Sequence, residues 1–271
     1  MVLRGLTFLT LIVIYILIFL SLNQSFPNRN INLERALPTK FQRVTSGYLK
    51  QLVSEIIFIK TSVFIGGVKP GTPETTYSGT LANNFEVMTS LYPEFIDPYY
   101  FCQSFLTPLS LESAQRANAI LNKGIETFPD DFILRFFYAF NFYRYLNDPL
   151  KSAQAFKKAS ALPDAPPMFA HLAVLFSAEG GNIKAGLIML KTMAAMEDNE
   201  KTLVKYQQEI DIFEKALVVE NAISSYTKKR LSAPEKLEDL VPEFIDQLPK
   251  IENNFILKYE PPVLRLKRKE S

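Results

Sequence analysis

Few side chains in this chain could carry out catalytic chemistry. His171 is the only histidine, so the chain supplies one imidazole base and no site with several histidine ligands. It lies in the apolar stretch 169–172, where we expect a packing or surface position rather than a catalytic one. Cys102 is the only cysteine, which excludes an intrachain disulfide. Its neighbours Phe101 and Phe105 favour a small buried hydrophobe over a nucleophile.

The paired carboxylates also have structural explanations. Asp130 and Asp131 stand at an expected helix start, where carboxylates satisfy free N–H groups and the positive end of the helix dipole. Glu238 and Asp239 fit a solvated helix face. Zinc, phosphate-loop and dinucleotide signatures are absent from the sequence. We therefore expect no enzyme, no cofactor, no metal and no small-molecule substrate, and keep a carboxylate-based enzyme as a third hypothesis.

Composition and charge argue against nucleic acid as a partner. The chain has 271 residues, of which 48% are hydrophobic, and a formal net charge of +2, so its apolar content is ample for a core. The aromatic-rich run 128–148 contains only two basic residues, Arg135 and Arg144, which is too few for a single-strand-binding groove. The basic tail 264–270 is expected to be solvated, with contact to anionic lipid as the alternative.

The N-terminus carries the strongest single signal. Gly5 to Leu22 is an uncharged apolar run of 18 residues, long enough to cross a bilayer as a helix, and no small-residue cleavage site follows it. We predict an uncleaved transmembrane anchor over 1–23 and a polar linker over 24–40. Arg4 favours a cytoplasmic N-terminus and a translocated body, but Arg29 lies on the other flank, so the opposite orientation stays open.

After the linker, the sequence is helical and repetitive. Apolar periodicity predicts a helix over about 41–64, and glycines and prolines then predict a loop over 66–79. Beyond it, Pro93, Pro129 and Pro163 recur 36 and 34 residues apart, each followed by an aromatic-rich helix start. This period indicates an array of helical hairpins.

The residues between these prolines resemble tetratricopeptide repeats (TPRs). Ser152, Phe156 and Ala159 match the small, aromatic and small positions of a second TPR helix, and Pro163 follows as the break. Matching segments lie near 80–93, 97–129, 131–163 and 167–197, within a repeat region 41–199. The resemblance implies an all-α, right-handed TPR-like solenoid. Phe105 stands where the family has a small residue, which implies looser packing at that repeat.

In such a solenoid, one side of each first helix lines a concave groove. The resemblance assigns the following residues to it: Tyr99, Cys102, Leu106, Leu109 and Ser110; Leu134, Phe137, Asn141, Arg144 and Tyr145; Ala170, Val174, Ser177 and Ala178. This apolar lining suits a hydrophobic or amphipathic helical segment of a protein partner. In the same register, Phe136, Phe140 and Tyr143 point into the hairpin and form core.

The remaining residues, 200–271, are expected to close the array. Thr202 to Arg230 reads as one long amphipathic capping helix, which could also fold back and fill the groove. The tail around Pro234, Leu240 and Tyr259 is similar to short tails of bacterial periplasmic and pilin-like proteins and includes a strand.

These features together resemble a bacterial membrane-anchored TPR protein. We expect a single-pass protein of the inner membrane with its body in the periplasm, acting as a non-enzymatic scaffold or assembly factor for another envelope protein. The alternative is a structural subunit of a larger membrane, secretion or pilus-type complex, with a self-filled groove.

Overall fold

The computed structural model describes residues 12–18, 33–252 and 254–269. The protein is mostly helical, with 68% of residues in helices, as the sequence predicts. The helices follow in the order α2 (Thr39–Ser46), η1 (Gly47–Leu49), α3 (Lys50–Gly67), η2 (Glu74–Thr76), α4 (Ser78–Leu91), α5 (Asp97–Phe105), α6 (Leu111–Thr127), α7 (Phe132–Arg144), α8 (Pro149–Ser160), α9 (Pro167–Glu179), α10 (Ile183–Ala195), α11 (Glu200–Arg230) and η3 (Leu237–Leu240). An antiparallel hairpin of β1 (Phe255–Glu260) and β2 (Val263–Arg268) ends the chain.

The predicted transmembrane anchor lies largely outside the described residues. Residues 12–18 of the run Gly5 to Leu22 are helical. Within the described ranges, no helix has both the length and the hydropathy needed to cross a bilayer. The anchor therefore stays a prediction.

Local sequence explains where the central helices begin. A side-chain oxygen just before the first turn accepts a backbone N–H at five helix starts, which are capped by Ser110, Asp131, Asp148, Asn182 and Asn199. Pro149 and Pro167 occupy first-turn positions, where a missing N–H costs nothing. These signals place α5–α6, α7–α8 and α9–α10 within the segments predicted as hairpins.

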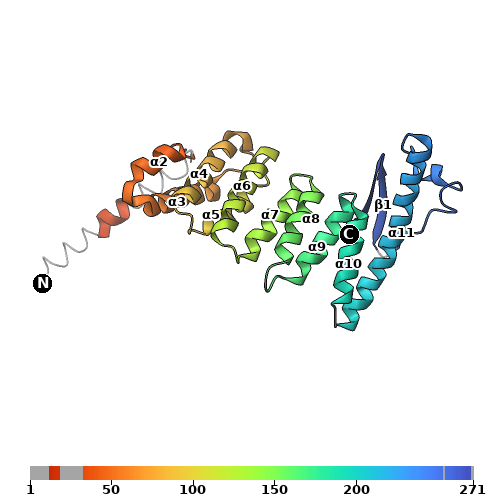
Figure 1. Ribbon diagram of the computed structural model, residues 1–271. Helices are drawn as coiled ribbons and strands as arrows, with labels where there is room; N and C mark the ends of the chain where they lie inside the picture. Colours follow the sequence, from red (N-terminus) through yellow and green to blue (C-terminus); the bar gives the residue numbers. More distant parts are fainter. Residues whose placement is uncertain (1–11, 19–32, 253, 270–271) are drawn as a thin grey trace, which may run out of the picture.

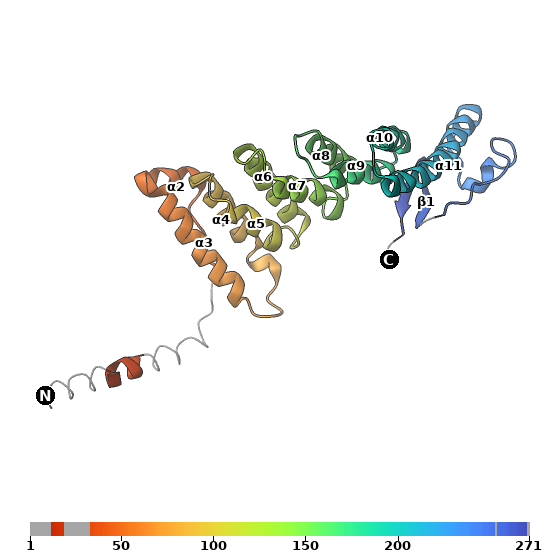
Figure 2. The same ribbon diagram turned by 90° about the horizontal axis from the view of Figure 1, so that it is seen from below.

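The helices follow one another in a row from α2 to α11 (Figures 1 and 2). Neighbouring helices pack together, and α4 also packs on α6 and α5 on α7. Three apolar clusters run along the row, the middle one centred on Phe156 and Phe169. Phe136, Phe140 and Tyr143 pack against it but are only partly buried, so their predicted direction into the hairpin is correct while their full burial is not.

At the N-terminal end, α3 and α4 form a further helical pair. The end of the predicted linker is bound to it, because Asn84 in α4 accepts from the N–H of Ala36 and donates to the carbonyl of Glu34, both at 2.9 Å. The predicted loop 66–79 is shorter than expected, since α3 continues to Gly67 and α4 begins at Ser78.

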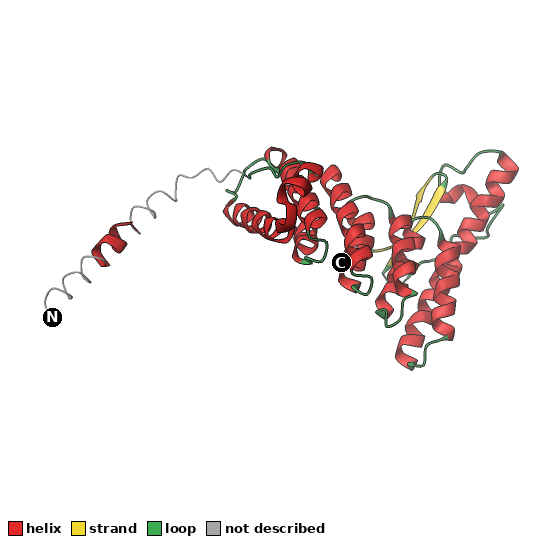
Figure 3. Ribbon diagram, turned by 60° about the vertical axis from the view of Figure 1, so that its left-hand side comes forward, coloured by secondary structure: helices red, strands yellow, loops and turns green. Residues whose placement is uncertain are grey.

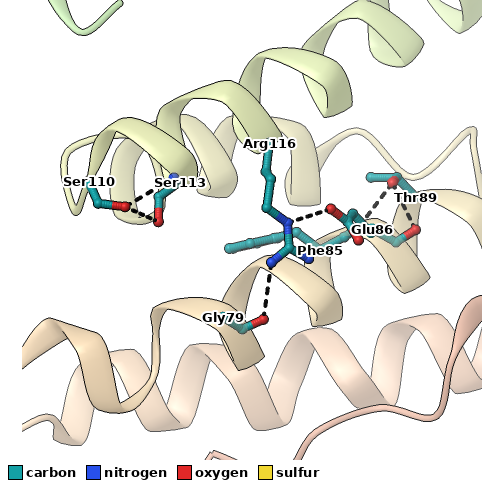
Figure 4. Close-up of polar contacts among 7 residues, drawn as sticks. All are labelled: Gly79, Phe85, Glu86, Thr89, Ser110, Ser113 and Arg116. Carbon is teal, nitrogen blue, oxygen red and sulfur yellow. Dashed lines mark hydrogen bonds and ion pairs between the residues drawn. The ribbon is translucent and has the colours of Figure 1, made fainter.

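An ion pair joins α4 to α6 (Figure 4). Arg116 Nε lies 2.8 Å from Glu86 Oε1, and a guanidinium nitrogen is 3.5 Å from the carbonyl of Gly79. Both charged side chains are about one-third exposed. The pair therefore links second helices of successive hairpins at their surface.

The C-terminal end is closed by α11 and the β-hairpin, whose strands lie beside that helix (Figure 3). Phe213 in α11 and Phe255 in β1 meet with ring centroids 6.2 Å apart. The strand expected near Tyr259 is present, and a second strand pairs with it. An all-α description is thus correct for the bulk of the chain but not for this end.

The expectation of a solvated basic tail is wrong for the part that forms β2. Lys267 pairs with Glu179 at 2.6 Å, and Arg265 donates to the carbonyl of Glu179 at 2.9 Å. Arg268 pairs with Glu209 of α11 at 2.6 Å. These cations hold the hairpin to α9 and α11, because hairpin pairing brings them opposite acceptors that are distant in sequence.

Candidate functional site

Most of the residues predicted to line a concave groove are buried. Eight of them are less than 9% exposed: Tyr99, Cys102, Leu106, Leu134, Asn141, Val174, Ser177 and Ala178. Phe137, Tyr145, Ala170 and Leu109 are partly exposed, whereas Arg144 and Ser110 are exposed. The prediction that these residues line an open groove is therefore wrong for its central positions, which form core rather than an accessible surface.

Close packing of α5 explains this burial. Tyr99 lies against Gly124 of α6, where an added Cβ would come within 2.8 Å of the tyrosine ring. Its hydroxyl donates to the carbonyl of Pro93 at 3.0 Å, and burial raises the pKa of Tyr99 to about 12. Burial also raises the pKa of the Cys102 thiol well above its ordinary value. The prediction that Cys102 is a buried hydrophobe is confirmed.

The long helix α11 does not lie along α5 and α7. It packs against α10, η3 and β2, and it reaches α9 through His171, whose Nε2 is 2.7 Å from Glu209. His171 thus pairs with a carboxylate of α11, a partner that its apolar neighbours in the sequence did not predict. Across the residues that the structure describes, no group of three or more His, Cys, Asp or Glu side chains could hold a metal ion.

An accessible concavity lies between α6 and the α7–α8 hairpin. It has a volume of about 520 Å³, within the range of ligand-binding clefts. Its lining residues are Leu111, Gln115, Asn118, Ala119 and Asn122 of α6, Tyr138 and Phe142 of α7, and Leu146, Asp148 and Lys151 at the α7–α8 junction. We call this concavity the α6–α8 hollow.

A network of side-chain amides supports one wall of the α6–α8 hollow. Gln103 and Asn141 exchange two hydrogen bonds, at 3.0 and 2.7 Å, and Asn141 also donates to Asn118 Oδ1 at 3.2 Å. Because Asn118 Oδ1 is an acceptor here, its Nδ2 remains a donor. That nitrogen is buried and has no acceptor among the described residues. The network therefore fixes the inner part of this wall, while the amides of Gln115 and Asn122 are exposed on its surface.

The opposite wall is aromatic. The rings of Tyr138 and Phe142 meet edge to face with centroids 5.1 Å apart, and Lys151 Nζ is 6.0 Å from the Phe142 centroid. Burial raises the pKa of the Tyr138 hydroxyl, although the nearby Lys151 charge opposes that shift. Tyr138 is therefore neutral at physiological pH.

The only charges that line the hollow neutralise each other. Asp148 accepts from the backbone N–H of Lys151 at 3.0 Å and pairs with its ammonium at 3.0 Å. Burial by itself would raise the pKa of Asp148, but these interactions with Lys151 lower it overall. The site therefore offers amide groups and aromatic surface rather than a free acid, base or nucleophile.

Sequence reasoning missed the hollow because it concentrated on the first helices. The available signal was a stripe of amides on α6: Gln115, Asn118 and Asn122 are spaced three and four residues apart and so share one face. That face becomes a wall of the hollow only because α6 and α8 do not pack closely on each other and leave a space beside α7. Comparisons with protein-family models, with curated proteins and with solved structures found no match, so the assignment of the α6–α8 hollow depends on its own geometry.

Proposed function

We propose that this protein is a non-enzymatic, TPR-like scaffold that binds a segment of another protein in the α6–α8 hollow. In this proposal, residues 5–22 anchor the chain in a bacterial inner membrane and the helical row stands in the periplasm as a short solenoid. Three successive helical hairpins, with lengths close to the 34-residue period, support the TPR-like part.

The observation that carries the proposal is the combination of amides and aromatic rings in one hollow. Gln115 and Asn122 present exposed amides along α6, and the buried amide of Asn118 lies between them in sequence. Such groups match the N–H and C=O groups of an extended peptide backbone. Tyr138 and Phe142 would cover one apolar side chain of the same segment.

The charges that line the hollow restrict the class of peptide segment that it can select. Asp148 and Lys151 pair with each other and together carry no net charge, so the hollow has no net charge that would favour an acidic or a basic ligand. An uncharged segment with one or two apolar side chains suits it best. Catalysis is not part of the proposal, since Asp148 is the only carboxylate that lines the hollow and it is held by its own lysine.

The test fills the hollow without disturbing the core. Ala119 is an exposed helix residue in the lining, so Ala119→Trp should occupy the space that a peptide would use. Lys123→Trp is the matched control, because Lys123 is an exposed residue of the same helix that does not line the hollow. Both variants should unfold at the wild-type temperature within a few degrees.

Binding is read with a photoreactive amino acid at Gln115 in the full chain, followed by mapping of the crosslinked peptide. The proposal expects a defined segment of one protein, lost with Ala119→Trp and kept with Lys123→Trp. Crosslinking that is unaffected by Ala119→Trp would contradict it. Recovery of a non-protein molecule would assign the hollow to a small ligand and would contradict the scaffold function.

A further inference from the structure

Helix α3 exposes an ordered stripe of large apolar residues. Leu52, Ile56, Ile59 and Val63 are 50%, 43%, 60% and 60% exposed, and they follow one another at intervals of four, three and four residues. The other side of the helix is buried against α4, through residues such as Phe64. Intervals of four and three are the a and d spacing of a helix that packs along a second helix.

The residues beside this stripe indicate what the second helix is. In the heptad register, Ile56 and Val63 occupy a positions, Leu52 and Ile59 occupy d positions, Glu55 is at g and Lys60 is at e. Glu55 and Lys60 are both exposed on opposite edges of the stripe. The pattern therefore has one negative edge and one positive edge.

These edges are complementary to a parallel copy of the same helix. In a parallel pair, a g residue faces the e residue five positions further along the partner, which joins Glu55 to Lys60 twice by symmetry. In an antiparallel pair, g edges face g edges and e edges face e edges, so neither charge would meet its opposite. Of the two d positions, Leu52 fits the combination that favours two strands, whereas Ile59 does not, so the charged edges carry the assignment.

We propose that α3 forms a parallel two-helix seam with α3 of a second copy of this chain. Lys60 is within 2.6 Å of Glu34 in the single chain, but both side chains are more than half exposed. An ion pair so exposed contributes little to stability, so Lys60 can turn to Glu55 of the partner at small cost.

A bilayer is the other occupant that an apolar helix face could have. A helix that docks on a membrane carries lysine and arginine along the borders of its apolar face. Here one border carries Glu55, which anionic lipid would repel. The edge charges thus favour a second helix over a lipid surface.

The proposed seam between the two α3 helices is short. From Leu52 to Val63 it extends about 16 Å at 1.5 Å per residue. Because α3 is already folded on α4, pairing does not require ordering a helix. If the chain is also anchored by residues 5–22, as proposed above, a parallel pair brings both anchors to the same side. The register itself does not depend on that anchor.

Cysteine crosslinking in the full-length protein tests the register. Cys102 is the only native cysteine and is buried, so the wild type is a suitable background. A parallel seam predicts that Ile56→Cys and Ile59→Cys each form a disulfide with the same position of a second copy. Leu111→Cys is the control, since Leu111 is 59% exposed but lies on α6. An antiparallel seam would instead join the cysteine of Ile56→Cys in one copy to the cysteine of Ile59→Cys in the other, so a disulfide would form only when the two variants are mixed. That result would overturn the proposal.

A charge exchange tests the partner assignment, with disulfide formation at Ile59→Cys as the measurement. Glu55→Lys and Lys60→Glu should each reduce the crosslinked fraction roughly threefold, and the double exchange should restore it. Glu34→Gln is the control and should leave the fraction unchanged or slightly higher, because it only frees Lys60. Failure of the double exchange to recover, or a spin label at Ile59 that contacts lipid in the full-length protein, would overturn the proposal.

Discussion

The two ends of the helical row meet the same packing problem in different ways. At the C-terminal end, the apolar face of α11 is covered by α10 and by the β-hairpin, and Phe213 is fully buried. At the N-terminal end, α2 and α3 expose a series of large apolar residues, and Val44 is 80% exposed. Each repeat in such a row buries one face against its neighbour, so each terminal helix leaves a face to be covered.

The difference indicates how each end is used. The C-terminal end is completed by the chain itself, with ion pairs from β2 to Glu179 and Glu209. The N-terminal end has the spacing and edge charges of a helix that is completed by a second chain. A closed end should respond to substitution through folding stability, whereas an open end should respond through association.

Truncating a side chain at each end should produce the largest contrast. Phe213→Ala removes a fully buried ring and should reduce the free energy of unfolding by about 3–5 kcal/mol. Val44→Ala, on exposed α2, should change it by less than about 0.5 kcal/mol. Denaturant unfolding of the two full-length variants measures both values, and equal losses would remove the distinction between the ends.

Glycine substitutions sharpen the contrast at the backbone. At Gly186 in α10, a Cβ would lie 2.8 Å from the Phe213 ring and 3.0 Å from the carbonyl of Val174, so Gly186→Ala should cost about 1–3 kcal/mol. At Gly66 in α3, a Cβ meets nothing within 4 Å, so Gly66→Ala should be neutral or stabilise by up to about 1 kcal/mol. The unfolding temperature should therefore fall for Gly186→Ala and stay equal or rise for Gly66→Ala. An unfolding temperature of Gly186→Ala equal to that of the wild type would show that α10 is not tightly packed at this position.

The smallest expected effect concerns acid stability of the C-terminal end. Burial alone would raise the pKa of Glu209, but the hydrogen bond from His171 and the charge of Arg268 lower it overall. A carboxylate with a lowered pKa stabilises the folded protein at pH values above its ordinary pKa of about 4.5. This contribution disappears as the pH falls through the lowered pKa. Glu209→Gln should thus cost about 1 kcal/mol at pH 7 and lose most of that difference in acid.

Unfolding of the wild type and Glu209→Gln between pH 7 and pH 3 measures this difference. Tyr206 lies one helical turn before Glu209 in α11, and burial, followed by the charges of Glu197 and Glu209, raises its pKa. Tyr206→Phe therefore serves as a control without a charge change in that range. A penalty for Glu209→Gln that stays constant across the series would show that the carboxylate charge is not what matters.

The central helices were predictable from the sequence because their signals are local. Proline breaks and capping residues mark where α6, α7 and α8 begin, and the predicted capping helix Thr202 to Arg230 corresponds to α11. The inward direction of Phe136 and Phe140 was predictable for the same reason, since periodicity assigns a residue to a face.

The exposed sites were not predictable in that way. Asn141 was expected in a groove, but it is buried because Gln103 and Asn118 from two other helices surround its amide. Conversely, Leu52 and Ile59 have the periodicity of core residues, and yet they are exposed. Periodicity assigns a residue to a helix face but does not say whether another element covers that face.

The sequence alone therefore determined most of the helices and their order, because capping, proline geometry and apolar spacing act within a few residues. The single helix predicted over about 41–64 is wrong, since the chain turns at Gly47 and divides it into α2, η1 and α3. Tertiary structure decided which faces are covered. The separation of α6 and α8, the return of the β-hairpin onto α9 and the open face of α3 arise from contacts between distant segments. Such contacts depend on how closely whole helices approach one another, a property that no short stretch of sequence contains.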